Sequence, residues 1–310
     1  MNILAELLLG ALIAVSLISC NTNDDTPVIS QTQIIDATGE VLSFKEPPTR
    51  LISLGPGNTE ILFALDAAHL VVGVDDFSDY PIEANKIEKV GAPFPSFDLE
   101  RIVALAPDLI VSTELADFNT TLRDLGIPVY VSNPQTLEEV FKIINDIGKL
   151  IGHSENATQL NSDMYSRITS IATLTASATP RKVFYEVDAS DPTRPYTVGS
   201  SSFVNDIIEI SGGINIFKDV DIAYPQVGLE EVVARDPDVI LLADAYAPVN
   251  PQSVEAAANR PGWKWITAVQ TGGLVPINPD LFSRPGPRLI DGIEYLSKLL
   301  HPLIFLNTER

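Results

Sequence analysis

The sequence predicts an α/β protein with two similar lobes and a single long helix between them. A fourteen-residue motif occurs twice, as LERIVALAPDLIVS (Leu99–Ser112) and LEEVVARDPDVILL (Leu229–Leu242), with seven identical positions. Short apolar runs alternate with helical patterns around both copies, which is typical of mainly parallel sheets. Helical spacing also continues from Ser154 to Leu174, and no loop rich in Gly and Pro separates the halves. These patterns divide the chain into an N-terminal lobe with a leading hairpin (33–152), a bridging helix (153–179) and a C-terminal lobe (180–310).

The first lobe opens with a hairpin, because Gln33–Phe44 alternates in polarity and contains a Thr-Gly turn. After the buried strand Leu51–Leu54, we expect a turn in which Asn58 or Thr59 caps a helix. That helix has apolar residues on one face. The remaining expected elements are a strand at Leu70–Val74, a helix capped by Asp98 that ends at Pro107, a strand at Leu109–Ser112, a helix end and a strand within Thr121–Asn133, and an amphipathic helix at Thr136–Gly152.

The second lobe begins with a strand at Lys182–Val187. The stretch Ser202–Gly213 reads as a helix with a glycine stop. A second copy of the motif then gives a helix at Leu229–Asp236, broken by Pro237, and a strand at Val239–Leu242. A strand at Gly273–Asn278 and a helix at Arg288–Pro302 complete the expected elements.

Composition narrows the class of protein. The 310 residues are 45% hydrophobic and 20% charged, which is ordinary for a globular protein. The formal net charge is −21, and a surface this acidic repels phosphate backbones. We therefore expect no nucleic-acid partner.

The N-terminus resembles a bacterial lipoprotein signal. The apolar run Leu7–Ile18 is too short to span a bilayer and suits a signal-peptide core. It ends in LISC, which resembles a lipobox, with the chain's single cysteine at Cys20. We expect residues 1–19 to be removed, Cys20 to carry the lipid, and residues 20–32 to form a polar tether.

Four segments together resemble one family: RLISLGPGNTEILFAL, VVGVDDFSDYP, LERIVALAPDLIV and SRPGPRLIDGIEYLSKLLHP. They resemble the substrate-binding proteins of cobalamin, siderophore and haem ABC importers, most closely the cobalamin branch, from about residue 33 to the end. The resemblance implies a ligand cleft between the lobes, small lobe movements, no enzymatic activity and no cofactor. It also implies a monomer outside the cytoplasm that delivers its ligand to a homodimeric permease.

The repeated glutamates gain a role from this resemblance. In the family, one glutamate on each lobe docks into arginine pockets of the two membrane subunits, and Glu100 and Glu230 match those positions. Carboxylate–arginine pairs suit docking because they are charge-assisted and often bidentate. The alternative is that each glutamate only stabilises the first turn of a helix. That alternative explains less well why Glu recurs at one position where the next residue changes from Arg101 to Glu231.

The expected ligand site lies in loops after the strands, where α/β sheets bind ligands. These loops carry aromatic residues, which offer flat apolar contact area. By residue-wise resemblance and position, the expected ligand contacts are Phe77, Tyr80, Phe94, Tyr196, Tyr224, Asp280 and Arg284. Thr113 stands where the family has an aromatic residue. Phe97 and Phe282 are expected to pack within the protein instead.

Within the family, a corrinoid is the first expected ligand, haem the second and a ferric siderophore the third. Haem binders of the family use a tyrosinate on iron, which Tyr80 or Tyr224 could supply. Anionic siderophores need cleft arginines, for which Arg194 and Arg284 are the candidates.

Other functions have weaker support. The three histidines, His69, His153 and His301, are dispersed and lie near element ends, so we expect surface or capping roles rather than a metal site. An extracytoplasmic hydrolase is the alternative of a different class. The serines of Val198–Ser202 lack a Gly-x-Ser-x-Gly elbow, and the pair Asp75–Asp76 is more typical of a solvated loop than of a glycosidase. A structural or adhesion lipoprotein would not need an aromatic cleft.

Overall fold

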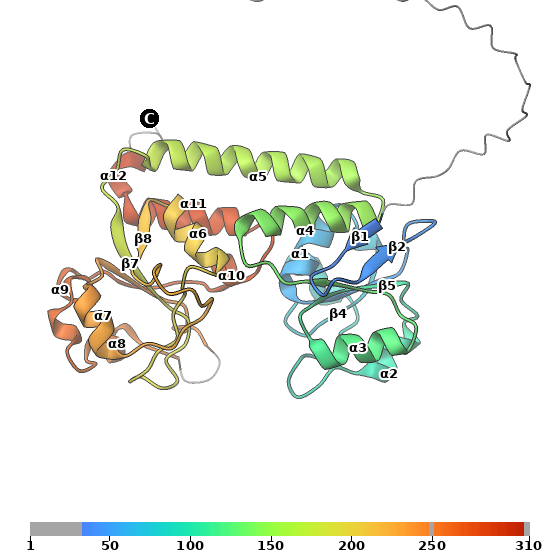
Figure 1. The fold of residues 1–310 in the computed structure, drawn as a ribbon, viewed down its shortest axis with the longest axis horizontal. Coiled ribbons are helices and arrows are strands. Elements are labelled where there is room, and N and C mark those ends of the chain that lie inside the picture. The colour runs from blue at the N-terminus through green and yellow to red at the C-terminus, as the bar shows by residue number, and fades with distance from the viewer. Residues whose placement is uncertain (1–32, 248–250, 307–310) are drawn as a thin grey trace, which may run out of the picture. The chain divides into compact units, whose positions relative to one another are not determined.

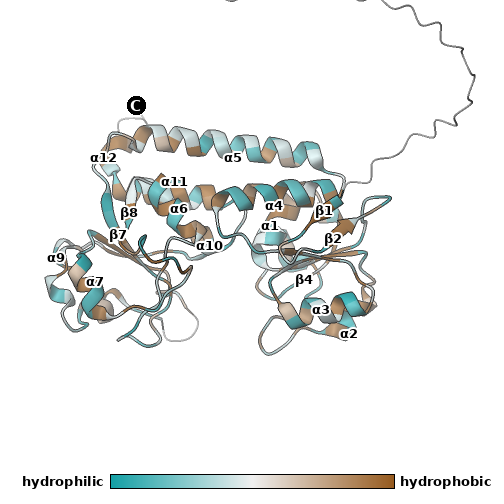
Figure 2. Ribbon diagram, viewed as in Figure 1, coloured by the Kyte–Doolittle hydropathy of each residue, from teal (hydrophilic) through white to brown (hydrophobic). Residues whose placement is uncertain are grey.

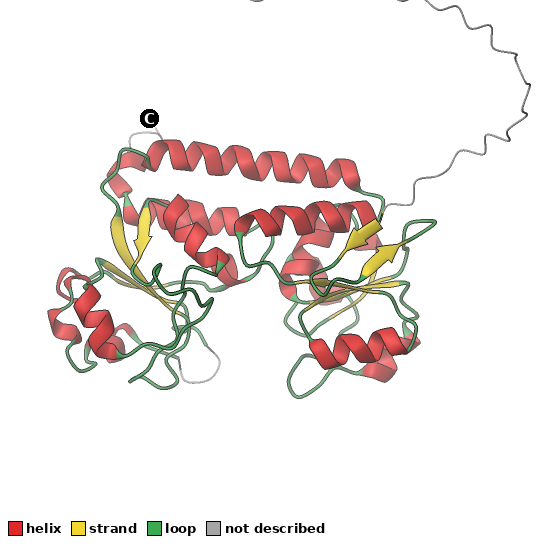
Figure 3. Ribbon diagram, in the orientation of Figure 1, coloured by secondary structure: helices red, strands yellow, loops and turns green. Residues whose placement is uncertain are grey.

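The computed structural model describes residues 33–247 and 251–306 of the chain. The predicted signal peptide (1–19), the tether (20–32) and Cys20 lie outside the described residues. Within them, the α/β fold predicted from the sequence is confirmed. Two four-stranded parallel sheets carry helices on both faces (Figure 1 and Figure 3).

The N-terminal lobe is built on a sheet with strand order β4-β3-β5-β6. Its strands are β3 (Leu51–Leu54), β4 (Val71–Val74), β5 (Leu109–Thr113) and β6 (Val129–Ser132), preceded by an antiparallel hairpin of β1 (Gln33–Ile35) and β2 (Val41–Ser43). Its helices are α1 (Pro56–Ala64), α2 (Leu99–Ala104), α3 (Ala116–Asp124) and α4 (Leu137–Leu150), with short 3₁₀ turns at η1 (Ala68–Leu70) and η2 (Ile82–Lys86).

The helix α5 (Ser154–Thr175) connects the lobes. The C-terminal sheet has the order β10-β9-β7-β8. Its strands are β7 (Arg181–Glu186), β8 (Gly213–Asn215), β9 (Val239–Leu242) and β10 (Leu274–Pro276). Its helices are α6 (Phe203–Ile210), α7 (Leu229–Arg235), α8 (Val254–Ala258), α9 (Thr267–Thr271), α10 (Asp280–Ser283), α11 (Leu289–Leu300) and α12 (Pro302–Phe305), with a 3₁₀ turn at η3 (Trp263–Trp265).

The sequence repeat is also a structural repeat. Counted within each lobe, the strands lie in the order second, first, third, fourth in both sheets. The two motif copies form α2–β5 and α7–β9, and the residue before each motif proline, Ala106 or Asp236, has a φ of 46°. The strand β8 was not predicted, because its first residue, Gly213, completes a glycine pair that reads as a helix stop.

The hydrophobic core joins the two lobes. One cluster of buried residues includes Leu51 and Val111 from the first sheet, Val183 and Leu241 from the second, and the inner faces of α4, α5, α6 and α11. Figure 2 shows hydrophobic segments on α4, α6 and α11, beneath a more polar α5. Neighbouring strand residues such as Ile52 and Phe184 belong to separate clusters on the opposite faces of the sheets, as strand alternation requires.

The start of α1 differs from the prediction. Its N-cap is Gly55, with a φ of 123°, and Pro56 is the first helical residue. Asn58 and Thr59, predicted as caps, are instead buried in the first turn. There the Asn58 Nδ2 donates to the Leu54 carbonyl, and its Oδ1 accepts from Ser132. These two polar residues therefore serve tertiary hydrogen bonds, which local capping rules do not describe. The predicted cap Asp98 is confirmed, since its carboxylate accepts from the Arg101 amide at 2.9 Å.

Candidate ligand site between the two lobes

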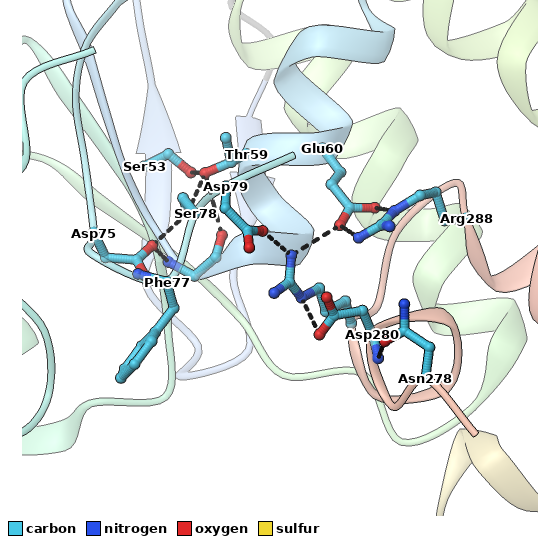
Figure 4. A network of polar contacts seen from close by, with 12 residues as sticks. Ser53, Thr59, Glu60, Asp75, Phe77, Ser78, Asp79, Asn278, Asp280 and Arg288 are labelled. Carbon is cyan, nitrogen blue, oxygen red and sulfur yellow. Dashed lines mark hydrogen bonds and ion pairs between the residues drawn. The ribbon is translucent and has the colours of Figure 1, made fainter. Parts of the chain in front are cut away.

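A chain of buried hydroxyl groups fixes the loop after β4. The Thr59 Oγ1 donates to Ser53 Oγ at 2.8 Å and lies 2.7 Å from Ser78 Oγ, which donates to Asp75 Oδ2 at 2.6 Å. Asp75 also accepts from the amides of Gly55, at 2.7 Å, and Phe77, at 2.9 Å (Figure 4). The buried Asp75 is thus a structural anchor for its loop, which argues against the glycosidase alternative.

The same loop presents two of the predicted ligand contacts. Phe77 is 55% exposed and Tyr80 is 46% exposed. Beneath them, the Lys89 ammonium group donates to the carbonyls of Ser78, at 2.6 Å, and Asp75, at 3.2 Å. Lys89 therefore fixes the loop backbone, while the aromatic side chains of the loop are exposed to solvent.

An ion network joins the loop to the C-terminal lobe. The Arg284 Nη1 contacts Asp79 at 2.6 Å and Glu60 at 3.7 Å, and the Arg284 Nε contacts Asp280 at 2.9 Å. Arg288, which precedes α11, makes a bidentate pair with Glu60 at 2.9 and 2.6 Å. Asp79 and Glu60 belong to the first lobe and both arginines to the second (Figure 4), so the network ties the lobes together.

Burial and pairing act in opposite directions on these carboxylates. Burial raises the pKa of Glu60, and the hydrogen bonds from Arg288 offset part of that rise. At Asp79, partial burial is outweighed by the hydrogen bond and charge of Arg284, so the pKa of Asp79 is lowered. Both arginines have carboxylate partners.

The C-terminal lobe contributes two exposed tyrosines from adjoining loops. Tyr196 is 43% and Tyr224 46% exposed. Backbone hydrogen bonds connect their loops, from Thr197 to Pro225 at 2.9 Å and from Val227 to Pro195 at 3.0 Å. The loops that carry these two predicted contacts are therefore joined through their backbones.

A pocket of about 350 Å³ lies between the lobes. From the first lobe it is lined by residues that end or directly follow β5 and β6, namely Thr113, Glu114, Ser132, Asn133, Pro134 and Gln135. From the second lobe it is lined by Ser202, Phe203, Tyr224, Ser283 and Pro285. Of the predicted contacts only Tyr224 lines this pocket. Hydrogen bonds link Asn133 to Glu114 and, at 3.0 Å, Gln135 to Asn133.

Several of these site residues were missed from the sequence. The position of Asn133 and Gln135 after a strand was a usable signal, because ligands bind beyond the carboxyl ends of parallel strands. Glu60, Asp79 and Arg288 gave no such signal, since Glu60 and Arg288 are 228 residues apart in the chain.

The other predicted aromatic residues differ in their surroundings. Phe94 is 85% exposed, the highest value among the aromatic residues predicted to contact the ligand. Phe97 stacks on Phe118 with ring centroids 4.7 Å apart, and Phe282 is 1% exposed in the core. Both of these last two therefore pack within the protein, as expected.

The repeated glutamates differ from their neighbours in pairing. Glu100 and Glu230 are exposed in the first turns of α2 and α7. Arg101 pairs with Glu88 at 2.7 Å, and Glu231 pairs with Arg235 at 2.9 Å. Within residues 33–247 and 251–306, neither Glu100 nor Glu230 forms a salt bridge. Figure 1 shows α2 and α7 on the side of the sheets away from α5.

The histidines have structural contacts. The His153 Nδ1 lies 2.7 Å from the Leu65 carbonyl, and its ring centroid is 6.3 Å from that of His69. His301 is buried rather than at the surface, and it contacts the Gly212 carbonyl at 3.0 Å. The part of the chain that the structure describes contains no group of three or more His, Cys, Asp or Glu placed to hold a metal ion. Nor does that part contain a helix that is both long and apolar enough to span a membrane.

Residues 51–281 match the periplasmic binding protein family, and the chain belongs to it. Membership of this family thus makes the chain a binding protein and not an enzyme. More particularly, it is a substrate-binding protein of an ABC transporter.

Relatives and solved structures agree with this assignment. The chain is 33% identical to an uncharacterized ABC transporter substrate-binding lipoprotein of Bacillus subtilis, over 98% of both chains. The crystal structure of the vitamin B12-binding protein of Vibrio cholerae is similar at a TM-score of 0.68 and 30% identity, covering 83% of this chain and 98% of that one. A periplasmic haem-binding protein from Roseiflexus has the same fold, with a TM-score of 0.72 over 82% of this chain and 98% of that one, at 23% identity.

Proposed function

We propose that this protein binds a corrinoid in the cleft between its lobes and delivers it to an ABC importer. The observation that carries the proposal is the neutralisation of the cleft arginines. Arg284 is shared by Asp79, Asp280 and Glu60, and Arg288 is paired with Glu60. An anionic ligand would have to compete with these carboxylates, whereas a ligand with neutral amide groups would not.

A large ligand with a flat face would be only partly enclosed by the pocket between the lobes. Small-molecule pockets commonly measure about 300–1,000 Å³, so a pocket of about 350 Å³ is at the small end of that range. A corrinoid would extend beyond it, over the exposed rings of Phe77, Tyr80, Tyr196 and Tyr224. Asp280 and Arg284 would support the ligand as a mutually paired polar group rather than as a free cation.

A titration with three ligands tests this proposal. We expect cyanocobalamin to quench the fluorescence of the protein in a saturable manner and to give a measurable heat by calorimetry. Haemin and an anionic ferric siderophore should bind at least about tenfold more weakly, a difference of about 1.4 kcal/mol. Tighter binding of haemin or the siderophore would overturn the choice of a corrinoid.

Haem remains the second candidate because the phenol groups of Tyr80 and Tyr224 are accessible at the site. Tyrosinate ligation would give a distinct Soret spectrum, and that spectrum should be lost in Tyr80→Phe or Tyr224→Phe. A ferric siderophore is the third candidate. For a siderophore, the one candidate cleft arginine without a salt bridge within the described ranges is Arg194, in the loop before Tyr196.

Delivery to the importer is proposed to use Glu100 and Glu230. Their side chains form no ion pairs with other described residues, so they could pair with arginines of two equivalent permease subunits. We propose that a monomer docks onto a homodimeric permease in this way. We further propose that lipidation of Cys20 anchors the protein on the outer side of a membrane. Cys20→Ala should release the protein into the soluble extracytoplasmic fraction.

A further inference from the structure

Arg288 combines a buried ion pair with an aromatic contact. Its Nη2 and Nε donate to the two carboxylate oxygens of Glu60 at 2.6 and 2.9 Å. Its Cζ lies 3.9 Å from the centroid of the Tyr80 ring. The Arg288 side chain is 15% exposed and that of Glu60 only 2% exposed, so both groups are largely removed from solvent.

This geometry fixes the plane of the guanidinium group. A bidentate pair holds a planar guanidinium in one orientation, which a single ammonium group could not reproduce. A cation stacked on an aromatic ring is attracted by the negative face of the π system. One face of the Tyr80 ring is therefore held by Arg288, and the residue as a whole is still 46% exposed.

The contact also crosses between the lobes. Tyr80 and Glu60 belong to the first lobe, whereas Arg288 directly precedes α11 of the second. Backbone packing is close at the same place, since a Cβ on Gly57 would lie 2.8 Å from the Pro285 carbonyl oxygen. A shift of one lobe against the other would therefore move the guanidinium relative to the ring.

We propose that Arg288 is a positioning residue, which holds the Tyr80 ring in its ligand-binding orientation and links that orientation to the relative placement of the two lobes. This inference rests on the proposed binding function. Arg288 acts through Tyr80 and not by contact with the ligand.

A double-mutant cycle tests the proposal. Arg288→Lys keeps the positive charge beside Glu60 but loses the planar fork, and we expect it to raise the Kd for cyanocobalamin about tenfold. In a Tyr80→Ala background, the same substitution should change the Kd less than about twofold. The matched control is Arg167→Lys, because Arg167 also contacts two carboxylates, Asp291 and Glu294, each at 2.8 Å, without an aromatic ring. It should leave the Kd unchanged.

Two outcomes of this cycle would overturn the proposal. One is a full effect of Arg288→Lys in the Tyr80→Ala background, which would place Arg288 in direct contact with the ligand or in a purely structural role. The other is no effect in the wild-type background. If Arg288→Lys loses its cooperative thermal transition, Glu60→Gln replaces it. Glu60→Gln weakens the same bidentate pair with Arg288. It should raise the Kd by less than Arg288→Lys does, and again only when Tyr80 is present.

A measurement without ligand separates this inference from the proposed function. With tyrosines labelled with ¹³C at the ε carbons and Tyr80 assigned through Tyr80→Phe, Arg288→Lys should shift the Tyr80 resonance and Arg167→Lys should not. An unshifted resonance overturns the positioning role even if corrinoids bind. Conversely, if the wild-type protein binds none of the three ligands, the proposed function fails and the resonance still decides whether Arg288 holds the ring.

Discussion

The ends of β3 and β7 occupy equivalent places in the two lobes, yet they carry different chemistry. Leu54 pairs with Ser112 in the first sheet as Glu186 pairs with Leu242 in the second. Around Leu54 the polar groups are the linked hydroxyls of Ser53, Thr59 and Ser78. In the second lobe the fully buried Glu186 is paired with Arg260, itself 6% exposed.

The difference extends to the next strand end. Glu114 follows β5 and is exposed, whereas Asp244, 130 residues later, is 5% exposed. One Asp244 oxygen accepts from the Ala189 amide at 2.8 Å, and the other has no hydrogen-bond partner in the described structure. The sequence repeat therefore determines where the strands end in each lobe, but not which polar groups lie at those ends. At the end of β7 the second lobe holds a buried ion pair, where the first lobe holds hydroxyl groups that end on the buried carboxylate of Asp75.

The largest expected effect concerns the one surface feature that the lobes share. If the two motif copies dock equivalently, Glu100→Ala and Glu230→Ala should each reduce uptake, and the double variant should abolish it. Ligand affinity should stay within about twofold, because both residues lie away from the pocket. Uptake of labelled cyanocobalamin and calorimetry of the isolated protein give the two readouts. Reduced affinity in the double variant would contradict a docking role.

The next effect distinguishes the two kinds of network directly. Arg260→Met leaves Glu186 buried without its partner and should lower the free energy of unfolding by about 3–5 kcal/mol. Ser78→Ala in the first lobe removes a hydroxyl that donates to the Asp75 carboxylate and should cost less, about 1.5–3 kcal/mol. Urea denaturation of both variants measures the contrast. Equal losses would mean that the two networks contribute alike.

A smaller effect compares the aromatic residues that the two lobes present to the ligand. Tyr224 lines the pocket between the lobes, so Tyr224→Ala should weaken corrinoid binding by about 1–3 kcal/mol. Phe94, 85% exposed in the first lobe, offers a matched aromatic truncation, and Phe94→Ala should cost less. Calorimetric titration decides the order. An unchanged Kd for Tyr224→Ala would remove this residue from the site.

The smallest effect is the pH dependence that one buried carboxyl group of the second lobe contributes. Burial, together with the nearby charge of Glu186, raises the pKa of Asp244 to about 6. In the unfolded chain the same carboxyl titrates near 3.9, so between about pH 4 and pH 6 the folded state binds more protons. This group therefore makes the protein more stable as the pH falls through 6, and less stable above it.

The variant Asp244→Asn should remove that contribution while keeping an acceptor for the Ala189 amide. We expect it to raise the free energy of unfolding at pH 7 by about 1–2 kcal/mol and to flatten its change between pH 4 and 6. Thermal melts across this range, compared with the exposed control Glu114→Gln, measure the effect. A wild-type slope retained in Asp244→Asn would assign the titration to another group.

Periodic features of this protein could be predicted from its sequence, and long-range polar contacts could not. The motif pair, the alternation of strands and helices and the long helix α5 each leave a local pattern of apolar residues, and each was found. The strand β8 is too short to leave such a pattern. Asn58, Thr59, Glu60 and Arg288 were misread or missed because their partners are distant in the chain. The exposed tyrosines were singled out because they follow strands, but the sequence did not show that, of the predicted contacts, Tyr224 alone lines the pocket between the lobes.

The core that runs from one sheet to the other through α4, α5, α6 and α11 has a thermodynamic consequence. Separating the two lobes would expose apolar surface to water, at a free-energy cost of about 25 cal/mol for each Å². Neither lobe can therefore unfold while the other stays folded. Heating should give a single calorimetric peak, for which the van't Hoff enthalpy equals the measured enthalpy of unfolding. Any ligand held by either half would then move that one peak as a whole.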